Sequence, residues 1–396
     1  MKHRCCNRRD FLRLGVTAAA APFAIQSAFW NPLAAEPARA PSKSGPGSRP
    51  DSKVAIVPCV GYGPEVQAAL ARSFDLLGGI GRLVNNKTVT VKLNLTGTNF
   101  TPVFNRPVGE SYMTHFSTAM ALGSLLFGAG AKRVRFVEST QSRASLESTL
   151  SLADWDVKAL SALGQVEYEN TRNLGRSKSY SHMKVAGDGY LFSSFDFNQS
   201  YEQTDVMVSL AKLKNHVTAG VTLSMKNLFG ITPNSLYGDQ AGSEDATAGR
   251  GPLHNPSSDP RIQLPGLKEN INIREATIRV PRIVADVCSA RPIHLAVIDG
   301  ITSMSGGEGP WCNRVAKLGL TTPGILIAGF NPVSTDAVGT AVMGYDNPRA
   351  ASGTKPFGFC ENHLLLAEQA GLGTADLSQI EVLGTSIAKA RYPYDA

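Results

Sequence analysis

The stretch of sequence that decides the fold is KVAIVPCVGYGPEVQAALARSFDLLGGIGRLVNNKTVTVKLNL, residues 53–95. Short runs of β-branched and other apolar residues lie at 54–60, 88–95 and 133–137. They alternate with longer segments of helical character at 64–77 and 116–129. Such alternation indicates βαβ units and a parallel sheet. We therefore predict a Rossmann-like α/β fold with a mostly parallel sheet and flanking helices.

The same kinds of element return in the C-terminal half of the chain. The pattern predicts helices at 276–288, 333–343 and 361–370. It predicts strands at 293–298, 324–329 and 380–383. Asn331 and Pro332 supply an N-cap and a first-turn proline for the helix that follows them.

The middle of the chain is less regular. The sequence predicts a hairpin around 187–189 and a long Gly- and Pro-rich loop over 233–265. We expect one α/β domain over 53–396, with lobes at 53–232 and 266–396 joined by that loop.

The N-terminal region has the order of a targeting signal. Arg8-Arg9-Asp10-Phe11-Leu12-Arg13 precedes a mildly apolar run at 14–29, and Ala38-Arg39-Ala40 offers a cleavage site. We predict a twin-arginine signal peptide over 1–40 and a disordered Pro/Gly/Ser-rich linker over 41–52. The expected location is the periplasm or another extracytoplasmic space, reached through the twin-arginine export machinery. The apolar run is shorter than the ~20 residues that span a bilayer, so we expect no stable membrane span after cleavage.

Charge and cysteine spacing exclude several classes of protein. The chain has a net charge of +7, but residues 1–40 carry six Lys or Arg against two acidic residues, which leaves +3 on the rest. So small an excess gives no reason to expect a nucleic-acid partner. Four cysteines beyond the signal, at 59, 288, 312 and 360, lie far apart without C-x-x-C spacing, so we expect neither an iron–sulfur cluster nor structural zinc. Disulfides and free thiols both remain open.

Polar and charged side chains close or follow four predicted strands, at 88–95, 133–137, 205–210 and 293–298. They are Lys92 and Asn94, then Glu138 and Ser139, then Lys212, Lys214 and His216, and finally Asp299. Ligands of open α/β sheets bind beyond the carboxyl ends of the strands. We therefore expect a functional site where these residues gather.

The densest polar segment is residues 211–230, with three lysines, a histidine and two asparagines among apolar neighbours. If a helix begins after His216, its backbone N–H groups and the lysines make a site for a phosphate or carboxylate. Like charge from the lysines should lower the pKa of His216 and favour its neutral form. The expected catalytic residues are His216 and Asp299, and the expected anion-binding residues are Lys92, Asn94, Lys212, Lys214, Lys226 and Asn227.

These residues belong to motifs that resemble those of the family called domain of unknown function 362 (DUF362). The matching pieces are Lys214-Asn215-His216 with Lys226-Asn227-Leu228-Phe229-Gly230, Lys92-Leu93-Asn94-Leu95, Val297-Ile298-Asp299-Gly300 with Gly309-Pro310, Asn331-Pro332-Val333 and Asp336-Ala337-Val338. The resemblance covers almost all of the chain after the linker. Many members carry a ferredoxin-like cysteine cluster, which this chain lacks.

A more distant resemblance is to the nickel-pincer lactate racemases, whose motif is H-x-x-A-G-[FY]-S-G-G-x-K. Residues 216–226 read HVTAGVTLSMK, which keeps the histidine-to-lysine spacing and the Ala-Gly pair. The resemblance implies proton transfer at His216, and cofactor attachment or anion binding at Lys226. It also implies a metal-binding histidine, for which His254 is the candidate. Leu223 and Ser224 replace two glycines that allow close approach of a bulky cofactor.

Other signals are less specific. Residues 306–310, GGEGP, could close over a ligand, and Asp336 is expected in the first turn of its own helix. No G-x-S-x-G, H-E-x-x-H or Walker motif is present. Two functions stay open: an isomerase or oxidoreductase that uses His216 for proton transfer, and a non-catalytic periplasmic binding or carrier protein for an anionic metabolite or metal complex.

Overall fold

The computed structural model describes residues 52–97, 100–259 and 261–395. The predicted signal peptide and all but the last residue of the predicted linker lie outside these ranges. No helix in the described ranges is both long enough and apolar enough to cross a membrane.

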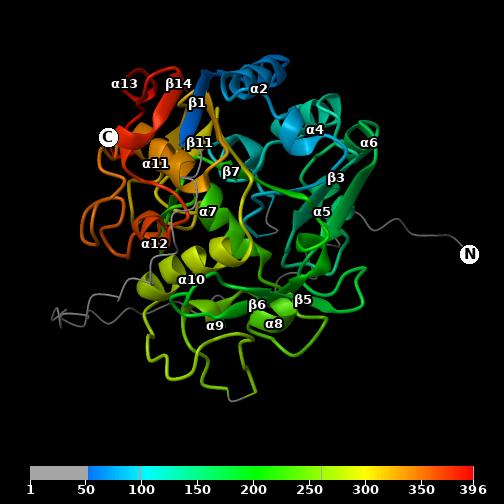
Figure 1. Cartoon of the computed structure of the whole chain (residues 1–396), viewed down its shortest axis with the longest axis vertical. Coiled ribbons are helices and arrows are strands. Elements are labelled where there is room, and N and C mark those ends of the chain that lie inside the picture. The colour runs from blue at the N-terminus through cyan, green and yellow to red at the C-terminus, as the bar shows by residue number, and fades with distance from the viewer. Residues whose placement is uncertain (1–51, 98–99, 260, 396) are drawn as a thin grey trace, which may run out of the picture. The chain divides into compact units, whose positions relative to one another are not determined.

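The described chain is built on one eight-stranded sheet (Figure 1). Its strands, in spatial order, are β14 (Glu381–Gly384), β1 (Lys53–Pro58), β13 (Ile325–Gly329), β10 (Leu295–Gly300), β7 (Val206–Lys212), β2 (Thr88–Lys92), β3 (Arg133–Glu138) and β4 (Val166–Asn170). All neighbouring pairs are parallel except the two that β13 makes with β1 and β10. The predicted α/β fold with a mostly parallel sheet is confirmed, and strands from both predicted lobes lie in this one sheet.

Alternating side chains of the strands feed two hydrophobic cores, one on each face of the sheet. In β1, Val54 and Ile56 face one core, whereas Ala55 and Val57 face the other. The core that contains Ala55 is covered by α2 (Glu65–Leu76), α3 (Gly81–Val84), α4 (Phe116–Gly128), α5 (Leu146–Leu152) and α6 (Val157–Ser161). The core that contains Val54 is covered by α7 (Leu223–Leu228), α10 (Ala276–Ala290), α11 (Pro332–Val342), α12 (His363–Gln369) and α13 (Ile387–Ala390).

Local sequence explains where several of these elements begin. The Asn331 side chain accepts a hydrogen bond from the Ser334 N–H at 3.0 Å, and Pro332 starts α11, as predicted. The hairpin predicted around 187–189 is confirmed, because β5 (Tyr180–Lys184) pairs antiparallel with β6 (Ser194–Asn198). It buries Phe195 and Phe197 in the core that contains Val54.

The predicted loop 233–265 is mostly irregular but contains two short helices, α8 (Asn234–Tyr237) and α9 (Gly251–His254). Figure 1 shows both beside the β5–β6 hairpin, and the Tyr180 hydroxyl lies 2.6 Å from Ser235 Oγ. The smaller elements are two two-stranded pairs, β8 (Asn215–His216) with β9 (Gly220–Val221) and β11 (Ser303–Ser305) with β12 (Gly319–Thr321), and 3₁₀ turns at Val108–Glu110, Gln199–Tyr201, Phe229–Ile231 and Leu377–Gln379.

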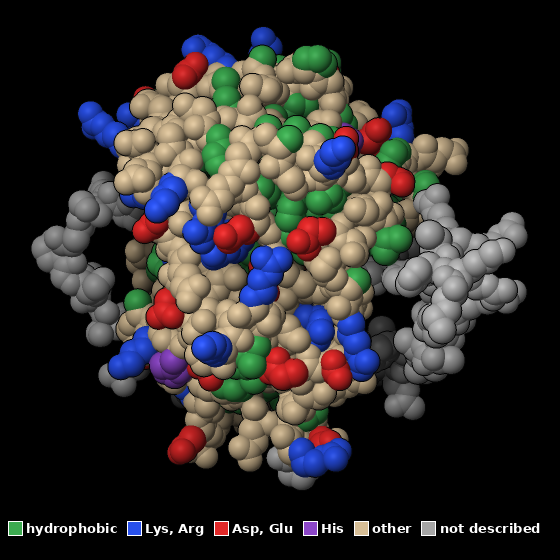
Figure 2. Space-filling view, turned by 90° about the vertical axis from the view of Figure 1, so that its right-hand side faces the viewer, with side chains coloured by type: hydrophobic (Ala, Val, Ile, Leu, Met, Phe, Trp, Pro, Cys, Tyr) green, Lys and Arg blue, Asp and Glu red, His purple; other side chains and the backbone are tan. Residues whose placement is uncertain are grey.

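Charges of both signs are interspersed over the face of the molecule drawn in Figure 2. No large group of Lys and Arg side chains gathers among the described residues of that face. This distribution agrees with the small charge excess of the chain beyond residue 40.

Candidate functional site

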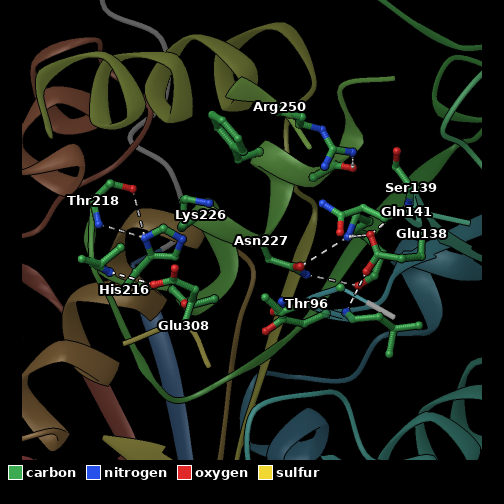
Figure 3. Close-up of a pocket in the computed structure, with 18 of the residues that line it drawn as sticks. Thr96, Glu138, Ser139, Gln141, His216, Thr218, Lys226, Asn227, Arg250 and Glu308 are labelled. Atoms are coloured by element: carbon green, nitrogen blue, oxygen red, sulfur yellow. Dashed lines mark hydrogen bonds and ion pairs between the residues drawn. The ribbon is translucent and has the colours of Figure 1, made fainter. Parts of the chain in front are cut away.

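A cavity of ≈350 Å³ lies beyond the carboxyl ends of β2 and β3, beside helix α7. This is the edge at which ligands of α/β sheets bind. Its polar and charged lining, part of which Figure 3 shows, comes from Lys92, Asn94, Thr96, Glu138, Ser139, Gln141, His216, Thr218, Thr222, Lys226, Asn227, Arg250, His254, Glu308 and Trp311. The structure thus brings together Lys92, Asn94, His216, Lys226, Asn227 and His254 from the sequence prediction.

One wall of the cavity is a buried ion pair. Lys92 Nζ lies 2.5 Å from Glu138 Oε1, and both side chains are almost fully buried. Lys92 also donates to the Leu93 carbonyl at 2.6 Å, and Glu138 accepts from the Leu95 N–H at 2.7 Å. Burial lowers the pKa of Lys92, and Glu138 opposes this shift. Lys92 is therefore neutralised inside the protein rather than free to bind an anion.

Asn227 connects this wall to helix α7. Its Nδ2 donates to Ser209 Oγ at 3.0 Å and to the Lys92 carbonyl at 3.3 Å. Asn94 lies nearby, where its Oδ1 accepts from the Lys212 N–H at 3.4 Å. The amides of Asn94 and Asn227 are thus partly used in holding the strand ends together.

Lys226 is the exceptional cation of the cavity. The residue is 8% exposed, and its ammonium nitrogen lies 4.3 Å from the centre of the Phe229 ring. No hydrogen bond or ion pair joins this nitrogen to any residue that the structure describes. Burial is the main cause that lowers the pKa of Lys226 to about 7. The charge of Glu308 raises this pKa, whereas the charges of Arg250 and Lys92 lower it. A buried charge is costly unless it is paired, so this ammonium is open to an anionic partner.

Arg250 adds a second cation to the same cavity. Its Nε donates to the Thr232 carbonyl at 2.8 Å, and one terminal nitrogen donates to the Gly230 carbonyl at 3.2 Å. These two bonds fix the plane of the guanidinium group and use fewer than its five N–H donors.

The hydrogen bonds of the two histidines give their rings opposite roles. His216 Nδ1 accepts from the Thr218 N–H at 3.2 Å, so in the neutral ring the proton is on Nε2. His254 Nδ1 lies 2.8 Å from the Arg250 carbonyl, to which it must donate, so its Nε2 has the free lone pair. The pKa of His216 is lowered well below its usual value, and the pKa of His254 is also lowered. The main cause for His216 is burial, followed by Lys226, so like charge alone was an incomplete explanation.

The glycine-rich segment 306–310 lies against the cavity, next to His216 (Figure 3). Glu308 Oε2 accepts from the Val217 N–H at 3.1 Å, and the Glu308 carbonyl accepts from Lys214 Nζ at 2.7 Å. Trp311, which is 55% exposed, stands at the rim. This segment thus supplies part of the cavity wall.

The structure does not bring Lys212, Lys214 and Asp299 into the lining of the cavity. Lys212 Nζ lies 3.1 Å from Asp299 Oδ2, and both side chains are fully buried. The Asp299 carboxylate also accepts from the hydroxyls of Tyr62 and Thr118 at 2.9 and 3.0 Å. Asp299 is therefore engaged in an internal network, which leaves it badly placed for the predicted role of catalytic base.

Lys214 is also engaged inside the protein. Its Nζ donates to Thr96 Oγ1 at 3.0 Å and to the carbonyls of Tyr112 and Glu308, each at 2.7 Å. Its three ammonium hydrogens are therefore used, and its position beneath the segment 306–310 stabilises that part of the cavity wall.

The prediction that a helix begins directly after His216 is wrong. The chain there forms β8 and β9, and α7 begins only at Leu223. The Ser224 and Met225 N–H groups donate to the Asp336 carboxylate at 2.9 and 2.8 Å, and Ser224 Oγ also bonds to it. The start of α7 is thus capped by the protein itself. Asp336 lies beyond the first turn of α11, not within it as expected, and burial raises its pKa to about 7.

Metal-binding side chains are sparse in the described residues. They contain no group of three or more His, Cys, Asp or Glu side chains placed to hold a metal ion. The cysteines at 59, 288, 312 and 360 are free thiols. His254 lines the cavity with an available Nε2, but the structure gives it no companion ligands of this kind.

The cavity also allows a test of the expected obstruction to a nickel-pincer cofactor. The side chains of Leu223 and Ser224 are fully buried and do not line the cavity. Leu223 has φ +43°, in the left-handed region that favours the glycine of the racemase motif. Leu223 and Ser224 therefore do not obstruct the cavity, but His254 has no companion metal ligand among the described residues, so these residues do not by themselves form a metal site.

The model of the family described as "Domain of unknown function (DUF362)" matches residues 89–341. This chain belongs to the DUF362 family. A curated relative of the DUF362 protein, the thylakoid-associated protein sll1697 of Synechocystis sp., is 28% identical over 173 residues. That alignment covers 43% of this chain and 47% of the relative, so the chain matches about half the length of that protein.

Among solved structures, the DUF362 chain matches the lactate racemase apoprotein of Thermoanaerobacterium thermosaccharolyticum. The sequence identity is 10% and the TM-score is 0.31. The match covers 71% of this chain and 56% of the racemase.

Sequence reasoning missed Arg250 and Gln141 and did not include Glu138, Ser139 or Glu308 among the site residues. Glu138 and Ser139 had a signal, because they follow a predicted strand, and Glu308 lies in the glycine-rich segment. Arg250 had none, since it comes from the long loop and reaches the cavity through the carbonyls of residues 230 and 232.

Proposed function

We propose that this DUF362 protein binds a small ligand with a carboxylate or phosphate group in the cavity beside α7, and that Lys226 makes the main charge contact. The observation that carries the proposal is the buried Lys226 ammonium, which has no hydrogen-bond or ion-pair partner in the described part of the chain. An anion would supply the missing counter-charge to this buried ammonium, and a buried pair is screened less by water than an exposed one.

The balance of charge in the cavity supports an anionic ligand. The lining includes two carboxylates and three cations: Glu138, Glu308, Lys92, Lys226 and Arg250. Lys92 is paired with Glu138, whereas Glu308 accepts from a backbone N–H and makes no ion pair with a described residue. Lys226 and Arg250 are therefore the cations available to a ligand, against the one carboxylate of Glu308.

We further propose that the bound ligand undergoes proton transfer, as in an isomerase or oxidoreductase. The Nε2–H of His216 is a donor and Nε2 of His254 is an acceptor, and both residues line the cavity. A pair of neutral imidazoles, one with a donor Nε2–H and one with an acceptor Nε2, can deliver one proton and accept another without a net change of charge. Lys226 and Arg250 would stabilise negative charge that develops on the ligand.

A carrier role is the second candidate, and one observation favours it. Asp299, which the sequence indicated as a base, is bound to Lys212, and Glu138 is bound to Lys92. With these two carboxylates engaged in ion pairs, Lys226 and Arg250 would act as a clamp for an anion rather than as part of a catalytic site. Mature protein purified from its native host distinguishes the two roles, because an enzyme should convert the retained ligand on incubation and a carrier should release it unchanged.

The test of ligand binding is native and denaturing mass spectrometry of that purified protein. A mass that is present under native conditions and lost on denaturation, with anionic character, supports the proposal. Protein without any bound mass, and without stabilisation by oxalate or phosphate, would contradict it, because a ligand at a hundred times its Kd should stabilise the fold by about 2.7 kcal/mol.

We also propose that the protein acts outside the cytoplasm after export by the twin-arginine machinery. The support is the paired arginines and the apolar run of the N-terminal region.

A further inference from the structure

The amine of Lys226 differs from the other buried lysines in one respect. The described residues contain four buried lysines, at 92, 212, 214 and 226. Lys92 and Lys212 each pair with a carboxylate, and Lys214 donates three hydrogen bonds. Lys226 alone presents its nitrogen to a cavity without an acceptor from the described protein. Its nitrogen is thus free to react as well as to bind.

The surroundings of Lys226 hold this amine in place. It projects from α7, whose start is fixed by the buried Asp336 carboxylate, and it packs over the Phe229 ring. A reactive group on a rigid element is positioned more precisely than one on a loop. Burial also lowers the pKa of Lys226 to about 7, so at neutral pH much of this lysine is the unprotonated nucleophile.

We propose that Lys226 is a nucleophile that forms an imine with the aldehyde or ketone group of an anionic ligand. This inference rests on the proposed function, since the ligand must first occupy the cavity. It assigns the ligand to a chemical class, the carbonyl compounds that also carry a carboxylate or phosphate. While the unprotonated Lys226 amine reacts with the carbonyl group, Arg250, whose donors are only partly used, contacts the anionic group.

The reaction balances without an oxidant or a reductant. The lone pair of the Lys226 nitrogen forms a bond to the carbonyl carbon, and a proton passes from nitrogen to oxygen to give a carbinolamine. The C–O bond then breaks, the former carbonyl oxygen leaves as water, and a C=N bond remains. The Nε2–H of His216 can donate to that oxygen, and Nε2 of His254 can accept the proton released by nitrogen.

The experiment uses glyoxylate, an aldehyde with a carboxylate, together with sodium cyanoborohydride on the protein that begins at Pro41. Reduction of the imine converts Lys226 to carboxymethyl-lysine, which trypsin does not cleave. The tryptic peptide 215–226 should then be replaced by the peptide 215–250 with one carboxymethyl group. Exposed Lys132 is the internal reference for ordinary lysine reactivity.

We expect Lys226 to be labelled at least about tenfold more than Lys132 at pH 7, since a lower pKa leaves more free amine. Excess oxalate, an anion without an aldehyde, should suppress labelling of Lys226 but not of Lys132. Lys226→Arg should lose the label and keep stabilisation by oxalate, because arginine retains the charge.

The imine and the anion site can fail separately. If glyoxylate and oxalate both stabilise the protein while Lys226 is labelled no more than Lys132, the imine is wrong and the anion site stands. If neither anion stabilises the protein and Lys226 is not labelled, both proposals are wrong.

Discussion

The carboxylate of Asp336 in α11 caps helix α7 through the N–H of Ser224, at 2.9 Å, although the two residues are 112 positions apart in the chain. Ser224 Oγ and the Met225 N–H bond to the same carboxylate. The motif that carries Lys226 is thus held by the motif around residue 336, and two widely separated parts of the DUF362 pattern form one structural unit.

This cap should make the stability of the fold depend on pH. The folded-state pKa of Asp336, about 7, lies above its ordinary value of 3.8. The folded protein therefore holds a proton that the unfolded chain releases between about pH 4 and pH 7, so this group stabilises the fold at low pH and loses that contribution as pH rises. In urea unfolding, Asp336→Asn should lower the free energy of unfolding by about 1–3 kcal/mol at pH 5 and reduce its decline toward pH 8.

Asp156→Asn is the matched control, because Asp156 caps α6 through the Ala159 N–H at an exposed position. It should leave the pH dependence of the wild type unchanged. Equal pH profiles for wild type and Asp336→Asn would refute the assignment of a raised pKa to Asp336.

The Lys212–Asp299 pair should prove structural. Asp299→Asn leaves the Lys212 ammonium buried without a counter-charge, which should cost about 3–5 kcal/mol of unfolding free energy. Lys212→Met combined with Asp299→Leu should cost less than the sum of the single changes, because the partners are removed together. Urea unfolding of the wild type, Lys212→Met, Asp299→Leu and the double variant measures this coupling. Asp299→Asn with wild-type stability and no ligand turnover would instead support the sequence-based role of Asp299 as a base.

Trp311 should report ligand binding at the rim of the cavity. The chain beyond residue 40 has two tryptophans, the exposed Trp311 and the buried Trp155. Oxalate should change the intrinsic fluorescence of the wild type and of Trp155→Phe, but not that of Trp311→Phe. A response that follows Trp155 instead would place the ligand elsewhere.

Export should depend on the arginine pair near the N-terminus. Replacing Arg8 and Arg9 together by lysine should leave full-length precursor in the cytoplasm, since the paired guanidinium groups are the recognised element. Fractionation and N-terminal sequencing provide the measurement, and the exported wild type should begin near Pro41. Normal export of the double variant would rule out the twin-arginine route.

Most of the sheet could be predicted from sequence because strand and helix patterns are local. The sequence could not predict which side chains pair at the strand ends. Asp299 lies opposite Lys212 in the register of β10 with β7, so the two charges neutralise each other, and only the strand order reveals this. Arg250 was missed for a similar reason, since its place in the cavity depends on contacts between a long loop and the end of α7.

The pH dependence of anion affinity should follow Lys226. Because the pKa of Lys226 is about 7 and an anion favours the protonated form, the affinity for oxalate should fall as pH rises from 6 to 9. The contribution of Lys226 to the stability of the ligand-free fold should change in the opposite direction, because the unfolded lysine, with a pKa of 10.5, binds more protons than the folded one above pH 7. Lys226→Met should flatten the affinity profile and remove this contribution to the pH dependence of stability.

The central claim, that Lys226 is the main anion contact, is tested most directly by calorimetric titration of oxalate at pH 6.5. The proteins compared are the wild type, Lys226→Ala and the matched exposed control Lys132→Ala. We predict that Lys226→Ala weakens binding by at least about tenfold, or 1.4 kcal/mol, while Lys132→Ala binds as the wild type does. Equal affinity in all three proteins would contradict the account.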